Sequence, residues 1–210
     1  MTLDPLNLVP RDKAALRAWA RRRRADQDIK ARLSDALRER LRVLPEFEAA
    51  RDILLYLAMP GEVSVESLAE RDAARQPGRR YYGPRCAPRR RLAVHRYVPG
   101  ETPLRPGPFG IREPDPAEVP EEDASRLDLV IVPALLLGEG GERIGHGGGY
   151  YDRFLPRLRP DCRRVGVLPD ALILPHLPQD PWDQRLDILV TESRVLRPAR
   201  SDRIGPNGSP

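Results

Sequence analysis

The sequence contains few cysteines, few aromatic residues and almost no lysine. Cys86 and Cys162 form neither a C-x-x-C pair nor a disulfide framework, which is typical of a protein from the reducing cytosol. Aromatic residues make up 5% of the chain, which leaves few platforms on which RNA bases could stack. Lys13 and Lys30 are the only lysines among 36 basic residues. The arginine excess therefore reflects genome composition and does not by itself indicate nucleic-acid binding.

Long apolar stretches and a secretion signal are also missing. No apolar run approaches the roughly 18 residues of a membrane span, and residues 1–10 lack the charged and apolar regions of a signal peptide. We therefore expect a cytoplasmic protein that does not bind a membrane. Its net charge of +5 and pI of about 9.6 suit anionic partners such as nucleotides, phosphorylated or polyglutamylated metabolites, or RNA.

Apolar runs alternate with amphipathic segments along the 210 residues. Strands are predicted at 52–58, 79–82, 91–97, 128–132, 164–168 and 186–191, with Pro84 and Pro88 separating the second from the third. Helices are predicted at 12–43, 65–75 and 151–158, and a long surface connection at 98–123. This order predicts an α/β fold, a single three-layer domain over residues 1–196 whose mostly parallel sheet is flanked by helices. Residues 197–210 are predicted to be a disordered tail.

Glycines concentrate between two of these elements. Seven of the 16 glycines fall between Gly138 and Gly149, after the strand at 128–132 and before the helix that begins near Tyr151. That density does not suit a helix or strand interior, but it suits a backbone that bends sharply or approaches a ligand. Free N–H groups at a helix start favour an anion. Arg143 and Arg153 could add charge-assisted bonds to a phosphate.

The common phosphate-binding motifs do not fit this loop. His146-Gly147 stands where a P-loop has Lys-Ser/Thr, and Tyr150 stands where the dinucleotide motif has its last glycine. A tight glycine turn without a ligand is therefore an alternative on the loop sequence alone.

Charged residues elsewhere are candidates for the same site. Lys13 lies one turn before Arg17, so both project from one helix face and could hold phosphates. Glu62 lies in the turn after the strand at 52–58, where open α/β sheets place ligand-binding groups. A solvated turn carboxylate is an equally good interpretation of Glu62.

The segment Arg143-Ile144-Gly145-His146-Gly147-Gly148-Gly149-Tyr150-Tyr151-Asp152 matches the pattern R-[LI]-G-x-G-x-G-[YF]-Y-D. It resembles the signature of the 5-formyltetrahydrofolate cyclo-ligases, also called methenyltetrahydrofolate synthetases. Further segments resemble the entry helix, strand-turn, middle linker and closing strand of that family: 13–17, 56–63, 109–114 and 183–191. The resemblance covers about residues 12–192 and implies a fold of the NagB/RpiA/CoA-transferase type.

The resemblance implies an ATP- and Mg²⁺-dependent enzyme that converts 5-formyltetrahydrofolate to 5,10-methenyltetrahydrofolate and releases ADP and phosphate. The γ-phosphoryl group would pass to the formyl oxygen, and the folate N10 would then attack the activated carbon as phosphate leaves. Such chemistry requires charge neutralisation and alignment. The partners would be ATP and 5-formyltetrahydrofolate, with or without a polyglutamate tail. We expect a monomer that does not bind nucleic acid.

Residue roles follow from the matching positions. The resemblance implies that ATP binds Lys13, Arg17, Arg143, Ile144, Gly145, His146, Gly147, Gly148, Gly149, Tyr150 and Tyr151. It implies catalytic roles for Arg143 and Tyr150, and folate binding by Leu57, Glu62 and Tyr150. It implies that Asp152 and Asp183 hold Mg²⁺, a cation that prefers oxygen ligands. Without the resemblance, Asp152 would be interpreted as a helix cap, Asp183 as a solvated acid and Tyr150 as a core residue.

Two loop positions depart from part of the family. His146 and Gly148 stand where some members carry arginine and lysine and other members carry neutral residues. Two other functions stay open at this point. One is a ligase or kinase for a different substrate, since a fold does not fix its substrate. The other is a non-catalytic nucleotide- or RNA-binding module, although the chain carries no appended RNA-binding motif.

Overall fold

One mixed sheet of eight strands forms the centre of the molecule. The computed structural model describes residues 12–23, 27–59, 62–72, 76 and 78–199. The strands of this sheet are β1 (Asp52–Leu54), β2 (Arg80–Ala87), β3 (Arg91–Arg96), β6 (Glu121–Glu122), β7 (Leu129–Val132), β10 (Arg163–Val167), β12 (Ile188–Val190) and β13 (Val195–Leu196). Their order is β13-β12-β10-β7-β1-β2-β3-β6. The strands from β12 to β2 pair in parallel, and β13, β3 and β6 are antiparallel.

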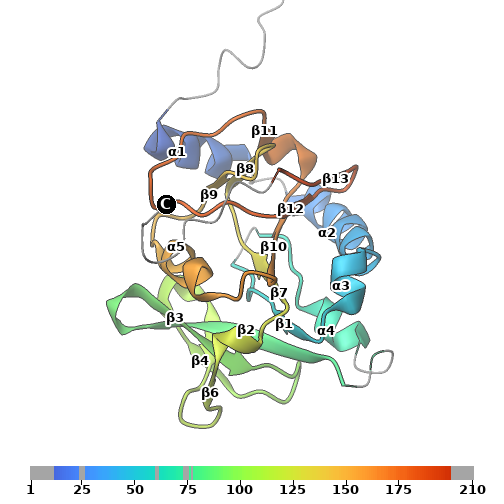
Figure 1. The fold of residues 1–210 in the computed structure, drawn as a ribbon, viewed down its shortest axis with the longest axis vertical. Helices are drawn as coiled ribbons and strands as arrows, with labels where there is room; N and C mark the ends of the chain where they lie inside the picture. Colours follow the sequence, from blue (N-terminus) through green and yellow to red (C-terminus); the bar gives the residue numbers. More distant parts are fainter. Residues whose placement is uncertain (1–11, 24–26, 60–61, 73–75, 77, 200–210) are drawn as a thin grey trace, which may run out of the picture.

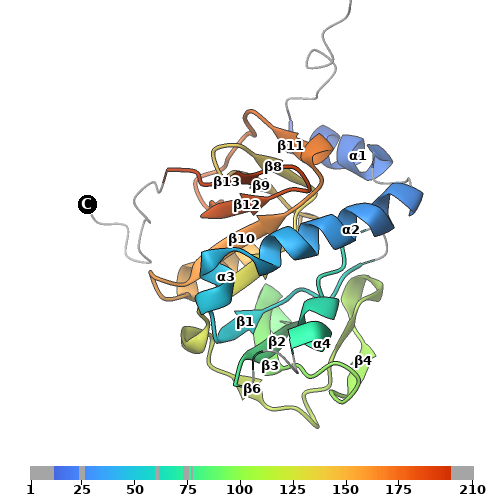
Figure 2. The same cartoon turned by 90° about the vertical axis from the view of Figure 1, so that its right-hand side faces the viewer.

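Helices cover both faces of this sheet (Figures 1 and 2). One face carries α2 (Gln27–Arg42), α3 (Pro45–Ala49) and α4 (Ser67–Asp72). The other carries α1 (Lys13–Arg23), α5 (Tyr150–Phe154) and a small sheet in the order β11 (Ile173–Leu174), β8 (Leu136–Gly138), β9 (Arg143–Ile144). Side chains alternate between the faces: Ile53 packs in one apolar cluster with Phe47, and Leu54 packs in the other with Leu16 and Phe154. The predicted three-layer α/β fold is confirmed.

The first helical segment begins as the sequence indicates. Asp12 accepts hydrogen bonds from the N–H groups of Ala14 and Ala15 at 3.0 and 2.9 Å, so it caps α1. The predicted helix at 12–43 is divided into α1 and α2, and the residues between them lie outside the described ranges. Leu16 and Ala20 are buried, which directs Lys13 and Arg17 toward the end of the sheet.

Several strand boundaries differ from the sequence-based prediction. β1 ends at Leu54, because the chain leaves the sheet there while residues 55–57 stay buried. β2 continues through Pro84, which the sequence placed between strands. Pairing of β2 with β1 ends at Tyr82, so on that side Pro84 has no ladder hydrogen bond to lose. The connection at 98–123 contains a hairpin of β4 (Leu104–Pro106) and β5 (Arg112–Pro114).

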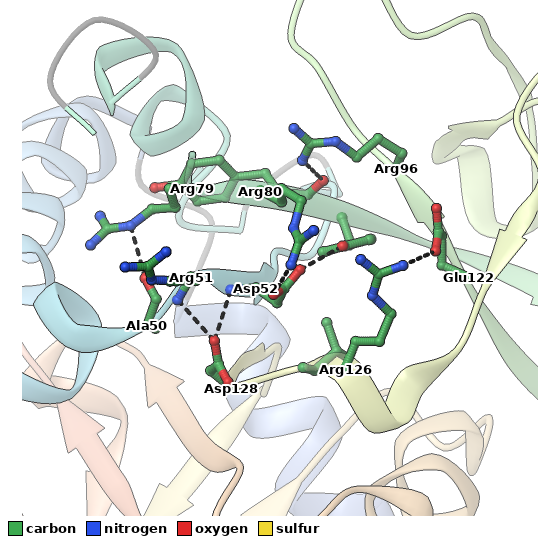
Figure 3. A network of polar contacts seen from close by, with 12 residues as sticks. Ala50, Arg51, Asp52, Arg79, Arg80, Arg96, Glu122, Arg126 and Asp128 are labelled. Atoms are coloured by element: carbon green, nitrogen blue, oxygen red, sulfur yellow. Dashed lines mark hydrogen bonds and ion pairs between the residues drawn. The ribbon is translucent and has the colours of Figure 1, made fainter. Parts of the chain in front are cut away.

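A polar network joins the amino ends of the central strands (Figure 3). The Asp128 carboxylate, just before β7, accepts from the N–H groups of Arg51 and Asp52 at 2.9 and 3.0 Å. The Asp52 carboxylate accepts from Arg80 at 2.5 Å and from the Tyr82 hydroxyl at 2.6 Å. Burial would raise the pKa of Asp52, but the hydrogen bonds from Arg80 and Tyr82 outweigh it and lower this pKa below its usual value. The network fixes the strand register and leaves the carboxyl ends free for ligands.

After β13, the described part of the chain ends at residue 199. Arg197 pairs with Glu46 at 2.9 Å, and residues 200–210 lie outside the described ranges, so the disordered tail stays a prediction. In the described part of the chain, no helix combines the length and the apolar character that crossing a membrane requires.

Candidate active site

A cavity of about 420 Å³ opens at the carboxyl ends of the parallel strands. Leu57, after β1, and Pro133, after β7, line it. Open α/β sheets bind their ligands at this edge, and the volume suits a small molecule. Every residue to which the resemblance gives a role lines this cavity: Lys13, Arg17, Leu57, Glu62, Arg143, Ile144, Gly145, His146, Gly147, Gly148, Gly149, Tyr150, Tyr151, Asp152 and Asp183. The fold brings these distant segments together, while their individual roles stay predictions.

The glycine loop joins β9 to α5. Gly147 has a φ of +99° and Gly149 a φ of +70°, in the left-handed region that glycine adopts without a steric penalty. A Cβ added at Gly148 would lie 2.8 Å from the Tyr150 ring. Glycine is therefore required by the turn itself as well as suited to a ligand. Because α5 has only 5 residues, shorter than the predicted helix at 151–158, side-chain cations matter here more than a helix dipole.

Lys13 stands between two carboxylates of the loop before β12. Its ammonium donates to Asp180 at 2.6 Å and also to Asp183. Burial alone would lower the pKa of Lys13, but the hydrogen bonds and charges of Asp180 and Asp183 raise it above its usual value. Lys13 is therefore fully protonated at neutral pH. Asp180 is a cavity residue that sequence reasoning missed.

Two arginines contact the glycine loop or the helix that follows it. Arg17 donates through Nε to the Gly145 carbonyl oxygen at 3.1 Å. Arg143 donates through Nη2 to Asp152 at 2.6 Å, and its guanidinium lies 5.8 Å from the centre of the Tyr151 ring. The Tyr151 hydroxyl is buried without a hydrogen-bond partner in the described residues, and burial raises its pKa. The predicted ATP-binding cations thus surround the loop.

The two predicted metal ligands are each held by a cation. Asp152 pairs with Arg143, and Asp183 pairs with Lys13. Within the described ranges, no group of three or more acidic, histidine or cysteine side chains is arranged to hold a metal ion by itself. Mg²⁺ often binds through one or two carboxylates together with substrate phosphates. The donor types present fit that mode of binding.

Glu62 lies on the cavity wall and is paired. Its side chain is 5% exposed, its Oε1 lies 3.0 Å from His146 Nε2, and its Oε2 accepts from the N–H of Met59 at 3.0 Å. The interpretation of Glu62 as a solvated turn carboxylate is wrong, because the side chain is buried at the cavity. Through His146, the glycine loop is linked directly to the turn after β1.

The remaining wall comes from β2, β3 and the segment before β5. The Cys86 N–H donates to Glu113 at 3.0 Å, and burial, then the Glu113 hydrogen bond, raise the pKa of the Cys86 thiol to about 12. The Phe109 ring meets the Tyr150 ring edge to face at 6.3 Å between centres. Local sequence did not single out Cys86, whereas Phe109 and Glu113 lie in the connection predicted at 98–123 and in the segment 109–114 that resembles the family's middle linker. Tyr150 is partly exposed at the cavity and so is not a plain core residue.

Comparison with known proteins identifies the family. The family model described as the 5-formyltetrahydrofolate cyclo-ligase family matches residues 10–192. The chain belongs to the 5-formyltetrahydrofolate cyclo-ligase family. A probable 5-formyltetrahydrofolate cyclo-ligase of Schizosaccharomyces pombe is 30% identical over 73% of this chain and 81% of its own length. The 5-formyltetrahydrofolate cyclo-ligase of Escherichia coli K12 is 29% identical over 83% of this chain and 96% of its own length.

Solved structures agree with this family. The 5,10-methenyltetrahydrofolate synthetase of Aquifex aeolicus is 31% identical, with a TM-score of 0.76 over 90% of this chain and 95% of its own. The predicted family, the fold and the class of enzyme, a ligase of folate one-carbon metabolism, are confirmed. The alternative of a non-catalytic RNA-binding module is not favoured by these matches.

Proposed function

We propose that the chain uses ATP and Mg²⁺ to convert 5-formyltetrahydrofolate to 5,10-methenyltetrahydrofolate, with release of ADP and phosphate. The observation that carries the proposal is a single cavity in which a glycine loop, three cations and a buried carboxylate meet. The glycine loop and the cations suit a triphosphate, and the carboxylate suits the donor-rich edge of a pterin. We further propose that the enzyme acts as a monomer in the cytosol and accepts polyglutamylated folate.

The phosphate side of the reaction depends on an exchange of partners. Lys13, Arg17 and Arg143 each have a protein acceptor in the structure: Asp180 and Asp183, the Gly145 carbonyl, and Asp152. A bound triphosphate would take over these donors, and charge-assisted bonds to phosphate would neutralise the charge that develops during transfer. The loop N–H groups would align the γ-phosphoryl group with the formyl oxygen.

The carboxylates released by this exchange would hold the metal. Asp152 and Asp183 are the cavity acids that the family signature implies for Mg²⁺, which supplies further neutralisation of the phosphates when it is bound. Their present cation partners keep these carboxylates neutralised before ligands arrive. Removing one carboxylate therefore affects both the metal and the cation that it holds.

The folate side would use Leu57, Glu62 and Tyr150. Glu62 would accept hydrogen bonds from the pterin, and its bond to His146 keeps it aligned next to the glycine loop. Tyr150 would pack against a ring of the folate. Burial, then Cys86, raise the pKa of the Tyr150 hydroxyl, so this group stays protonated and can donate a hydrogen bond. No covalent intermediate with the protein is required.

The test is direct. The protein is mixed with 5-formyltetrahydrofolate, ATP and Mg²⁺, and the absorbance of the methenyl product is followed. Lys13→Gln should raise the KM for ATP by about ten-fold or more, because a charge-assisted contact to phosphate is lost. Arg51→Gln removes one positive charge at the opposite, amino end of the sheet and should change nothing. No product from folded wild-type protein would overturn the proposal.

A further inference from the structure

The turn between β2 and β3 has an unusual backbone for its sequence. The Arg91 N–H donates to the Pro88 carbonyl oxygen, and the two residues between them, Arg89 and Arg90, have φ of 59° and 56°. Two successive left-handed residues give the type I′ hairpin turn, which favours Asn-Gly. Two arginines here are strained, since a side chain in this region crowds its own backbone. Turn formation alone therefore does not explain the sequence.

Backbone strain of this kind occurs next to the cavity. Among the described residues, only Arg89, Arg90 and Phe109 combine a positive φ with a side chain. Arg90 and Phe109 both line the cavity, and Phe109 is 58% exposed although it is a large apolar residue. Left-handed residues other than glycine cluster at ligand-binding sites, where a side chain must be held in a fixed direction. The rim formed by β2, β3 and the turn 108–110 is such a place.

The charges at this rim are not neutralised. The other cations that line the cavity have protein acceptors: Lys13, Arg17, Arg143 and Arg153. The Arg90 guanidinium has neither a hydrogen bond nor an ion pair with any described residue, and the same holds for Arg89. The nearby carboxylate of Glu113 is bound by Cys86 instead.

The position of these arginines indicates which anion they would bind. α1, with Lys13 and Arg17, lies at the top of the molecule in both views, whereas β2 and β3 lie in the lower half (Figures 1 and 2). On the α1 side, the glycine loop and its cations would bind the triphosphate. The wall next to Arg90 is apolar, with Leu92, Phe109 and Ile111. An aromatic ring followed by a carboxylate suits this wall better than a phosphate does.

We propose that Arg90 binds the first glutamate of the folate substrate, and that Arg89, next to it in the turn, continues this site outward for additional glutamyl carboxylates. The inference rests on the proposed function, since it concerns the tail of the same substrate. The aminobenzoyl ring would lie along Phe109 and Ile111, and the tail would leave the cavity at the β2–β3 turn. Arginine suits this task because its planar guanidinium binds a carboxylate through two hydrogen bonds.

The experiment compares 5-formyltetrahydrofolate carrying one and three glutamates in steady-state kinetics. Arg90→Gln and Arg90→Gly should each raise the KM for both substrates by about five-fold, because both carry the first glutamate and one partly exposed charge pair is lost. Arg89→Gln should raise the KM for the triglutamate alone. The KM for ATP should stay unchanged. Arg90→Gly should also raise the melting temperature, because it relieves the left-handed strain while it removes the charge. Arg51→Gln is the control for loss of charge alone.

The outcomes separate this inference from the proposed function. Turnover of both substrates by wild-type protein, with KM values for both that are unchanged in the two Arg90 variants, would overturn the glutamyl site and leave the enzyme activity standing. A rise in the KM for ATP in the Arg90 variants would also overturn it, in favour of a phosphate contact. No turnover of either substrate would instead contradict the proposed function.

Discussion

Replacing Asp152 with asparagine tests the phosphate end of the cavity. The Asp152 Oδ1 accepts from Arg143 Nη2 at 2.6 Å, and the two side chains are 23% and 5% exposed. Asparagine keeps an acceptor oxygen but leaves the buried guanidinium without a counter-charge. A hydrogen bond to a charged group contributes about 1.5–3 kcal/mol, and asparagine retains part of it. We therefore expect a loss of about 1–2 kcal/mol in the free energy of unfolding, which lowers Tm by about 2–8 °C for a chain of this size.

The effect on activity should be much larger than the effect on stability. If Asp152 is a ligand of Mg²⁺, turnover at limiting Mg²⁺ should fall by at least about 100-fold and recover in part when Mg²⁺ is raised. Asp161→Asn is a matched control, since Asp161 also pairs with an arginine, Arg159 at 3.0 Å, but is 72% exposed and outside the cavity. Turnover and thermal unfolding are measured on both variants. An Asp152→Asn enzyme with the Mg²⁺ dependence of the wild type would refute the metal role.

Three further predictions concern stability. Asp52→Asn should lower the free energy of unfolding by about 1–3 kcal/mol in urea titrations, because the Arg80 and Tyr82 hydrogen bonds lose a charged acceptor. The pKa of Asp52 is lower in the folded protein than its unfolded value of about 3.9. The stabilisation that its carboxylate provides should therefore be complete above that pH and disappear as the pH falls through the folded pKa. An Asp52→Asn variant that loses stability in acid as steeply as the wild type would contradict this. Gly149→Ala should lower the free energy of unfolding by about 1–2 kcal/mol, because its φ is +70°; equal urea midpoints would refute the strain. Deleting 200–210 should leave Tm and turnover unchanged, and a fall in either would show that the tail packs on the domain.

The sequence was sufficient for the features that depend on local pattern. Apolar runs predicted β7, β10 and β12, because parallel strands covered on both faces are mostly apolar, although β10 begins with two arginines. Asp12 and the spacing of Leu16 and Ala20 predicted α1. The decamer that ends at Asp152 identified the family. These patterns require only neighbouring residues, so they can be recognised before any tertiary contact is known.

Other cavity residues could not be predicted, because only long-range packing brings them there. Arg90 lies in a turn whose sequence gives no I′ signal, and Phe109 lies in a long connection whose path over the site is not specified by its local sequence. Asp180 reaches Lys13 across 167 residues. Trp182 is 66% exposed in the same loop and lines the cavity, although its local sequence resembles an ordinary polar turn.

The charge pairs of the cavity link groups that serve different ligands. Lys13–Asp183 and Arg143–Asp152 each join a cation that the family signature implies for ATP to a carboxylate that it implies for metal, and His146–Glu62 joins the glycine loop to the folate wall. The first two pairs neutralise buried or half-buried charge before ligands bind, which avoids the cost of leaving such groups unpaired. On the proposed mechanism, binding of ATP to the cations would make the carboxylates available, so nucleotide and metal affinities would depend on one another. Arg90 has no such counterpart among the described residues, because its proposed anion would arrive with the substrate itself.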